Sequence, residues 1–129
     1  MGTRSITIVK DEDNNKIIEM YKQFDGYPEG LGQELADFIN SGTMVNGLGN
    51  GRNVFNGISC FAAQLVNHFK EGPGGIYLHS PSSNSFNAKS YSEKYGVDYV
   101  YEIDSKLNLK GWNAWSNILL DNSVKDNDE

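Results

Sequence analysis

The stretch 57–71 constrains the fold most, because its apolar residues recur with the period of an amphipathic helix. They stand at i, i+3, i+4, i+7, i+8 and i+11: Ile58, Phe61, Ala62, Leu65, Val66 and Phe69. A helix with one such face buries it against another layer of structure. The run Gly-Pro-Gly-Gly at 72–75 predicts the end of the helix. The rest of the chain must therefore supply an apolar partner for this face.

Segments with β-branched and alternating residues predict a sheet as that partner. Residues 5–10 and 16–24 flank a short Asp/Asn-rich turn, which is typical of an antiparallel hairpin. Residues 75–80 and 97–104 are predicted as two further strands, and residues 107–110 as a short strand that pairs back onto the last one.

A first helix is predicted at 30–40, where four apolar residues form one stripe: Leu31, Leu35, Phe38 and Ile39. The resulting order is β-β-α-α-β-β, without the βαβ alternation of a doubly wound parallel sheet. We therefore predict an α+β fold, an antiparallel sheet of four to five strands with two helices packed on one face. Residues 1–120 form a single domain and 121–129 an acidic flexible tail, whereas 81–95 and 111–120 have no clear pattern.

Composition and charge exclude several classes of function. The formal net charge is −6 with only 11 lysines and arginines, so binding to duplex nucleic acid is not expected. A single cysteine excludes an internal disulfide and a cysteine-based zinc cage. No apolar run approaches membrane-spanning length, so we expect no membrane partner and a cytoplasmic protein.

The segment 24–30, Phe-Asp-Gly-Tyr-Pro-Glu-Gly, joins the predicted hairpin to the first predicted helix. The proline holds Tyr27 extended, and the carboxylate of Glu29 suits the start of a helix. Asp25 and Gly26 fit a turn in which the glycine has a positive φ angle. Loops at strand ends also concentrate functional side chains, so a simple turn and a site both remain open.

The other candidate site residues are scattered along the chain. Arg4 starts the first strand, and Arg52 with Asn53 follows a Gly/Asn-rich loop before the second helix, where backbone amides favour anions. That loop matches neither the dinucleotide fingerprint nor the P-loop, so a flexible loop stays an alternative. His79 ends a predicted strand as a candidate acid or base. Trp112 is a candidate for stacking on a base or sugar, for a subunit interface, or for the core.

The opening Met-Gly-Thr-Arg and the later Phe-Asp-Gly-Tyr-Pro together resemble a set of small bacteriophage and prophage proteins. Members of that set open Met-(Gly/Ser)-Thr-Arg and carry (Phe/Trp)-Asp-Gly-Tyr-Pro, and their function is not settled. The similarity covers roughly the first 40 residues. It implies that Arg4, Asp25, Gly26, Tyr27 and Pro28 belong to one unit. An antiparallel hairpin would bring Arg4 beside Asp25, either as a structural lock or to orient Arg4 toward a ligand.

We therefore expect a phage-type accessory protein that sequesters a small anionic, nucleotide-derived host defence signal without catalysis. The candidate ligand-binding residues are Arg4, Asp25, Tyr27, Arg52, Asn53, His79 and Trp112. We expect no metal or other cofactor, and a homo-oligomer in the cytoplasm of the host cell. Two alternatives are a small hydrolase or transferase that uses Asp25 or Glu29 with His79, and an inhibitor that binds a host protein.

Overall fold

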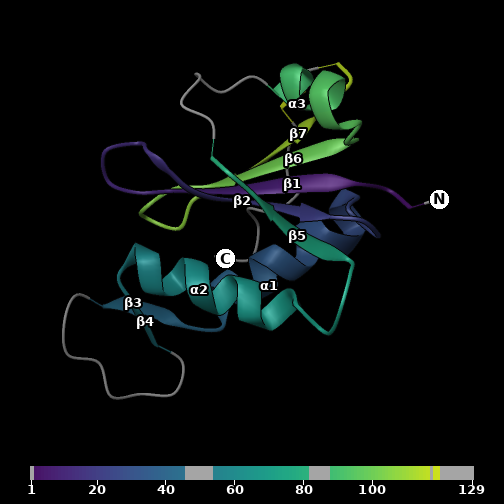
Figure 1. The fold of residues 1–129 in the computed structure, drawn as a ribbon. Coiled ribbons are helices and arrows are strands. Elements are labelled where there is room, and N and C mark those ends of the chain that lie inside the picture. Colours follow the sequence, from purple (N-terminus) through teal and green to yellow (C-terminus); the bar gives the residue numbers. More distant parts are fainter. Residues whose placement is uncertain (1, 46–53, 82–87, 117, 120–129) are drawn as a thin grey trace.

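The computed structural model describes residues 2–45, 54–81, 88–116 and 118–119, which form a sheet with helices on both faces (Figure 1). The central sheet has the spatial order β5 (Ile76–His79), β2 (Lys16–Lys22), β1 (Ser5–Lys10), β6 (Tyr99–Ile103), β7 (Leu109–Asn113) and the two-residue β8 (Ile118–Leu119). A separate parallel pair consists of β3 (Thr43–Val45) and β4 (Val54–Asn56). The helices are α1 (Gln33–Asn40), which continues a π-helical turn (Pro28–Gly32), α2 (Ile58–Phe69) and α3 (Ala88–Tyr95).

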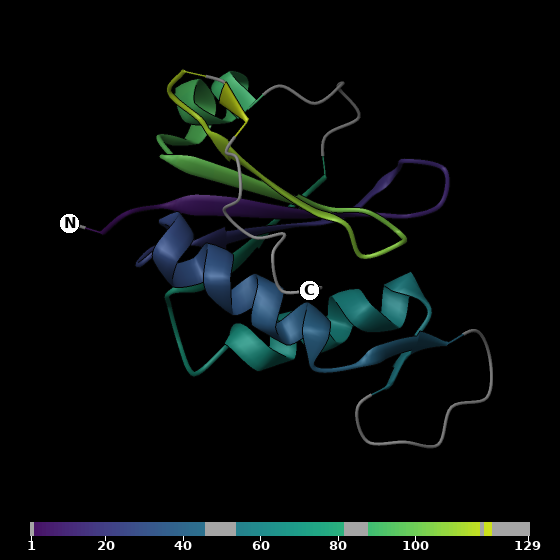
Figure 2. The ribbon, with the colours of Figure 1, turned by 180° about the vertical axis from the view of Figure 1, so that it is seen from behind.

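These elements form three layers, because α1 and α2 cover one face of the central sheet and α3 covers the other (Figures 1 and 2). The hairpin of β1 and β2 is antiparallel, as its short polar turn predicts. β1 pairs on its other side with β6 in parallel, with Ser5 opposite Tyr99. The first strand of the chain therefore lies in the middle of the sheet.

The larger core lies between the sheet and the two helices α1 and α2. Its fully buried side chains include Val9, Met20, Leu35, Phe61 and Leu65. The predicted stripe of α2 supplies this core, so the helical pattern and its buried face are confirmed. The helix begins after a glycine, Gly57, whose φ angle of 87° is left-handed and would strain any other residue.

A smaller core lies under α3, on the opposite face. Ile6 and Ile8 point into it from β1, and Tyr91 and Ala88 point into it from α3. Together with Val9 and its neighbours on the other face, these residues leave β1 buried on both sides. Such burial is usual for a central strand between two layers.

The α+β class is confirmed, but the predicted order and the two-helix count are wrong. The sheet is mixed rather than antiparallel, because β1 and β6 run in parallel. α3, with the sequence AKSYSEKY, is an additional helix within a stretch that lacked a clear apolar period. The predicted tail, 121–129, lies outside the described residues. No helix in the described ranges is long and apolar enough to cross a membrane.

Candidate functional site

The turn after β2 is shaped by a close approach of two chain segments. Gly26 is buried, and a Cβ atom on it would lie 2.7 Å from the Cβ of Ser5. Its carbonyl accepts a 2.7 Å hydrogen bond from the buried hydroxyl of Tyr101. The positive φ angle predicted for Gly26 is wrong, since Asp25 adopts it, at 58°. The glycine is required here for space rather than for backbone conformation.

Tyr27 packs over the start of the π-helical turn. A Cβ atom on Gly30 would lie 2.9 Å from Cε1 of the Tyr27 ring, so the ring covers this glycine closely. The Tyr27 hydroxyl donates to Oδ1 of Asp25 over 3.5 Å. The carbonyl of Asp25 accepts from the amide of Leu31 at 3.0 Å. These contacts give Tyr27 a structural role, although 39% of the residue stays exposed.

Arg4 and Asp25 belong to neighbouring segments but do not pair. The amide of Gly26 donates to the carbonyl of Thr3 at 2.9 Å, so the chain ends of the hairpin meet as predicted. The predicted Arg4–Asp25 ion pair is wrong, because neither side chain forms an ion pair within the described part of the chain. Asp25 lines a groove between α1 and α2, whereas the guanidinium of Arg4 lies against Gly96, which follows α3.

Arg4, Gly96, Asp98 and Trp115 form what we call the arginine corner. The carboxylate of Asp98 accepts from the backbone amide of Arg4 at 3.2 Å and from the indole of Trp115 at 2.7 Å. The carbonyl of Arg4 in turn accepts from the amide of Asp98 at 2.8 Å. A Cβ atom on Gly96 would lie 3.4 Å from Nη2 of Arg4, so the guanidinium rests on this glycine.

Two side chains of the arginine corner, those of Arg4 and Trp115, are not fully engaged by the described residues. Among the described residues, the guanidinium of Arg4 has no hydrogen-bond or ion-pair partner. Trp115 is held by its indole nitrogen and is still 61% exposed. A guanidinium binds phosphate or carboxylate through its planar fork, and an exposed indole ring stacks on a base. The sequence suggested Arg4 as a candidate, but nothing local in it linked Asp98 or Trp115 to Arg4.

His79 lies in a row of rings on the α3 face. Its imidazole stacks on Tyr21 with a centroid distance of 5.5 Å and lies 4.5 Å from the ring of Tyr95. Its Nδ1 atom is buried and has no hydrogen-bond partner in the described residues. Asp25 lines the groove on the opposite face of the sheet, so the structure does not bring His79 and Asp25 together as an acid/base pair.

The remaining predicted site residues do not complete a common site. Trp112 is half-buried in β7 and packs against the smaller core, opposite Val100. Arg52 and Asn53 lie outside the described residues. Arg4, His79 and Trp112 thus share the α3 face of the sheet, whereas Asp25 and Tyr27 lie at the start of the opposite layer.

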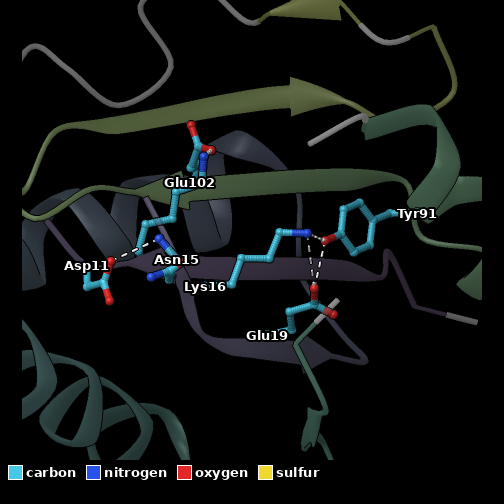
Figure 3. A network of polar contacts seen from close by, with 7 residues as sticks. Asp11, Asn15, Lys16, Glu19, Tyr91 and Glu102 are labelled. Atoms are coloured by element: carbon cyan, nitrogen blue, oxygen red, sulfur yellow. Dashed lines mark hydrogen bonds and ion pairs between the residues drawn. The ribbon is translucent and has the colours of Figure 1, made fainter. Parts of the chain in front are cut away.

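A buried polar network connects β2 to α3 (Figure 3). Nζ of Lys16 donates to the hydroxyl of Tyr91 at 2.7 Å, and this hydroxyl donates to Oε2 of Glu19, also at 2.7 Å. The side chain of Glu19 is 0% exposed and that of Lys16 is 6% exposed, and their charged atoms are 3.6 Å apart. Burial and the hydrogen bond to Glu19 raise the pKa of Tyr91 above its usual value.

A second ion pair, between Lys10 and Glu102, joins the neighbouring strands β1 and β6 beside this network. Because the groups of the network are enclosed, their geometry suits holding α3 on the sheet rather than meeting a substrate. Alternation in β2 puts Glu19 on the face opposite Ile18 and Met20, but nothing local in the sequence indicates that α3 covers that face.

The groove between α1 and α2 has a volume of about 750 Å³. Four carboxylates line it, those of Asp25, Glu34, Asp37 and Glu71. Aromatic rings form part of its wall, including Phe38, His68 and Phe69. No cluster of three or more histidine, cysteine, aspartate or glutamate residues in the described ranges could hold a metal ion.

Comparisons with known proteins found no match: no protein-family model, no curated protein and no solved structure resembles the chain significantly.

Proposed function

We propose that this chain is a phage-type accessory protein that binds and sequesters a small anionic, nucleotide-derived host defence signal without catalysis. The observation that carries the proposal is the arginine corner, where the guanidinium of Arg4 has no ion partner among the described residues and Asp98 links the backbone of Arg4 to an exposed indole. Nucleotides combine a phosphate with a flat base, and the two side chains match these two parts.

The arginine corner is preorganised for such a ligand. Asp98 fixes the backbone of Arg4 and the indole nitrogen of Trp115 through separate oxygens. The indole ring is therefore held in place before a base stacks on it, which lowers the entropy cost of binding. The guanidinium of Arg4 has no ion-pair partner among the described residues of an acidic protein, so it provides a local site for a phosphate group.

The proposal includes a homo-oligomer, because a corner open on the surface of so small a chain encloses a ligand only with a second copy over it. The other candidate contributors to the ligand site remain Arg52, Asn53, His79 and Trp112.

The alternative of a hydrolase or transferase has less support, since Asp25 and His79 lie on opposite faces of the sheet.

Sequestration is tested by incubating the protein with a panel of cyclic nucleotides and cyclic ADP-ribose-type molecules, followed by heat denaturation. We expect one class of ligand to disappear from solution and to return chemically intact after heating, as chromatography would show. A chemically altered ligand would identify an enzyme, and a panel left undepleted would contradict the proposal.

Variants at the arginine corner test its role. Arg4→Ala should remove a charged hydrogen bond and weaken binding by about 1.5–3 kcal/mol. Trp115→Ala should remove base stacking worth about 1–3 kcal/mol. Lys106→Ala removes the same charge from an exposed position in the β6–β7 turn and serves as the control, with affinity unchanged. Normal binding by folded Arg4→Ala and Trp115→Ala variants would place the ligand elsewhere.

A further inference from the structure

The groove between α1 and α2 differs in charge from the arginine corner and lies on the other face of the sheet. The four carboxylates that line it come from the turn after β2, from α1 and from Glu71, which follows α2. The cations in its lining are Lys22 and, when protonated, His68. Its electrostatic potential is therefore negative, which attracts positive groups and repels phosphate.

The carboxylates of the groove are not neutralised within the described part of the protein. None of Asp25, Glu34, Asp37 and Glu71 forms an ion pair there. Asp37 accepts a hydrogen bond from the side-chain amide of Gln33 at 3.0 Å, and Asp25 accepts the one from Tyr27. Both bonds come from uncharged donors, so the negative charge of the groove is retained for a partner.

The spacing of the carboxylates excludes a single metal ion as that partner. No three acidic, histidine or cysteine side chains in the described ranges lie close enough together to hold a metal. Negative charges spread along a groove fit several separate positive charges. An extended segment with lysine and arginine side chains carries its charges in this way.

The aromatic wall of the groove favours arginine and lysine side chains over a small cation. The ring of Phe38 lies 4.7 Å from the imidazole of His68 and 5.4 Å from the ring of Phe55. His68 also contacts Phe69, edge to face, at 4.9 Å. Guanidinium groups stack on such rings, and the alkyl stems of lysine and arginine pack against them.

We propose that the groove between α1 and α2 docks an arginine- and lysine-bearing segment of a partner protein. The carboxylates bind the positive groups, and the rings of Phe38, His68 and Phe69 cover their apolar stems. A groove between two helices is a common place for a peptide segment to bind. This site is independent of the proposed anion site, so the protein binds two partners of opposite charge on opposite faces.

The test is a titration of the isotopically labelled full-length protein with a short synthetic peptide of alternating arginine and leucine, followed by NMR. We expect amide shifts to concentrate on residues of the groove, and the affinity to fall as salt screens the carboxylates. The Glu34→Gln/Asp37→Asn double variant should lose at least about tenfold in affinity. The control, Glu12→Gln/Asp13→Asn, removes the same charge from the exposed β1–β2 turn and should lose less than about twofold.

Three results would overturn the proposal. Equal losses in the two double variants would show general attraction to an acidic protein. Shifts caused by spermine but not by the peptide would identify a small-cation site. No shifts in the groove at low salt would show that it does not bind basic segments. A peptide of alternating glutamate and leucine is the matched probe and should not bind.

Discussion

The two faces of the central sheet are held by different chemistry. On one face, α2 contributes four buried apolar residues, Ile58, Phe61, Ala62 and Leu65. On the other face, α3 buries only Ala88, Tyr91 and Ser92. The hydroxyl of Tyr91 compensates by joining a buried ion pair of β2. α3 has eight residues and little apolar surface, so directional polar bonds anchor it to the sheet. These bonds specify its position but add little buried apolar surface.

This difference predicts that the two faces respond differently to the same class of change. Loss of one apolar side chain should be costly on the α1/α2 face. Loss of one charge should be costly on the α3 face, because it breaks an ion pair and leaves the other charge in a buried site.

The largest effect is expected for Glu19→Ala. The variant leaves the buried ammonium of Lys16 without its carboxylate, which typically costs about 3–5 kcal/mol. Equilibrium unfolding in urea, followed by circular dichroism, measures this loss in the free energy of unfolding. The double variant Lys16→Met/Glu19→Leu removes both charges and should be more stable than the single variant, although Tyr91 still loses its bond to Glu19. If the double variant is no more stable than the single one, a missing charge partner is not the cause.

Leu65→Ala should cost about 2–5 kcal/mol, because it opens a cavity in the larger core. Leu78→Ala is the matched control, since Leu78 on β5 is 55% exposed and should change stability by less than about 0.5 kcal/mol. The same urea experiment compares the two. Similar losses for the two variants would show that the burial of Leu65 is not what makes its side chain important for stability.

Each face also holds one buried tyrosine hydroxyl, which allows a direct comparison. Tyr91→Phe removes a bond to a charged carboxylate and should cost about 1.5–3 kcal/mol. Tyr101→Phe removes a bond to the neutral carbonyl of Gly26 and should cost about 1 kcal/mol. Differential scanning calorimetry of the parent and the two variants gives the order of the stability losses. A larger loss for Tyr101→Phe would contradict the prediction that the bond to the charged carboxylate contributes more.

The same tyrosines predict a loss of stability at alkaline pH. Burial raises the pKa of both, aided by Glu19 for Tyr91 and by the charges of Tyr99 and Glu29 for Tyr101. Because the folded state holds these protons more tightly, their contribution is complete below the unfolded pKa of about 10 and is lost as pH rises beyond it. Each Phe variant should therefore show a shallower loss between about pH 10 and 11. An unchanged slope would show that the hydroxyl ionises as easily in the folded state.

The smallest effect is expected for Asp104→Asn, in the β6–β7 turn outside both cores. Burial raises the pKa of Asp104, but hydrogen bonds from Asn108 and Lys106 and the charge of Lys110 outweigh it, so the pKa is lowered. A lowered pKa adds stability above about pH 4, which is lost as pH falls further. The variant should be less stable by under about 1 kcal/mol at pH 7 and converge with the parent in acid, as thermal melts would show.

The sequence predicted the elements whose structure is determined by the pattern of their own residues. α2 has a helical apolar period over its whole length, and the β1–β2 hairpin has alternating strands around a polar turn. α3 was missed because only Tyr91, Tyr95 and Ala88 are apolar in it, and the sheet beneath decides its burial. The parallel pairing of β1 with β6 was missed because no short-range pattern indicates which distant strand pairs with β1.

The candidate site was predictable only in part for the same reason. Arg4 stood out because arginines are scarce in this chain. Its partners in space, Asp98 and Trp115, follow from the pairing of β6 with β1 and β7. The alternation in β2 does not indicate that Glu19 is buried, because the helix that buries it lies 69 or more residues further along the chain. Contacts of this range depend on the assembled sheet.

The position of β1 also has a consequence for the order in which the protein assembles. The amide of Arg4 reaches the carboxylate of Asp98 across 94 positions of the chain, and β1 borders β6 along its length. The middle of the sheet therefore cannot close until most of the polypeptide has been synthesised. Loops of this size are slow to close, and a strand that has not yet paired exposes its hydrogen-bonding edge until they do. During translation, β1 and β2 can form their hairpin early, but the free side of β1 stays open until β6 leaves the ribosome.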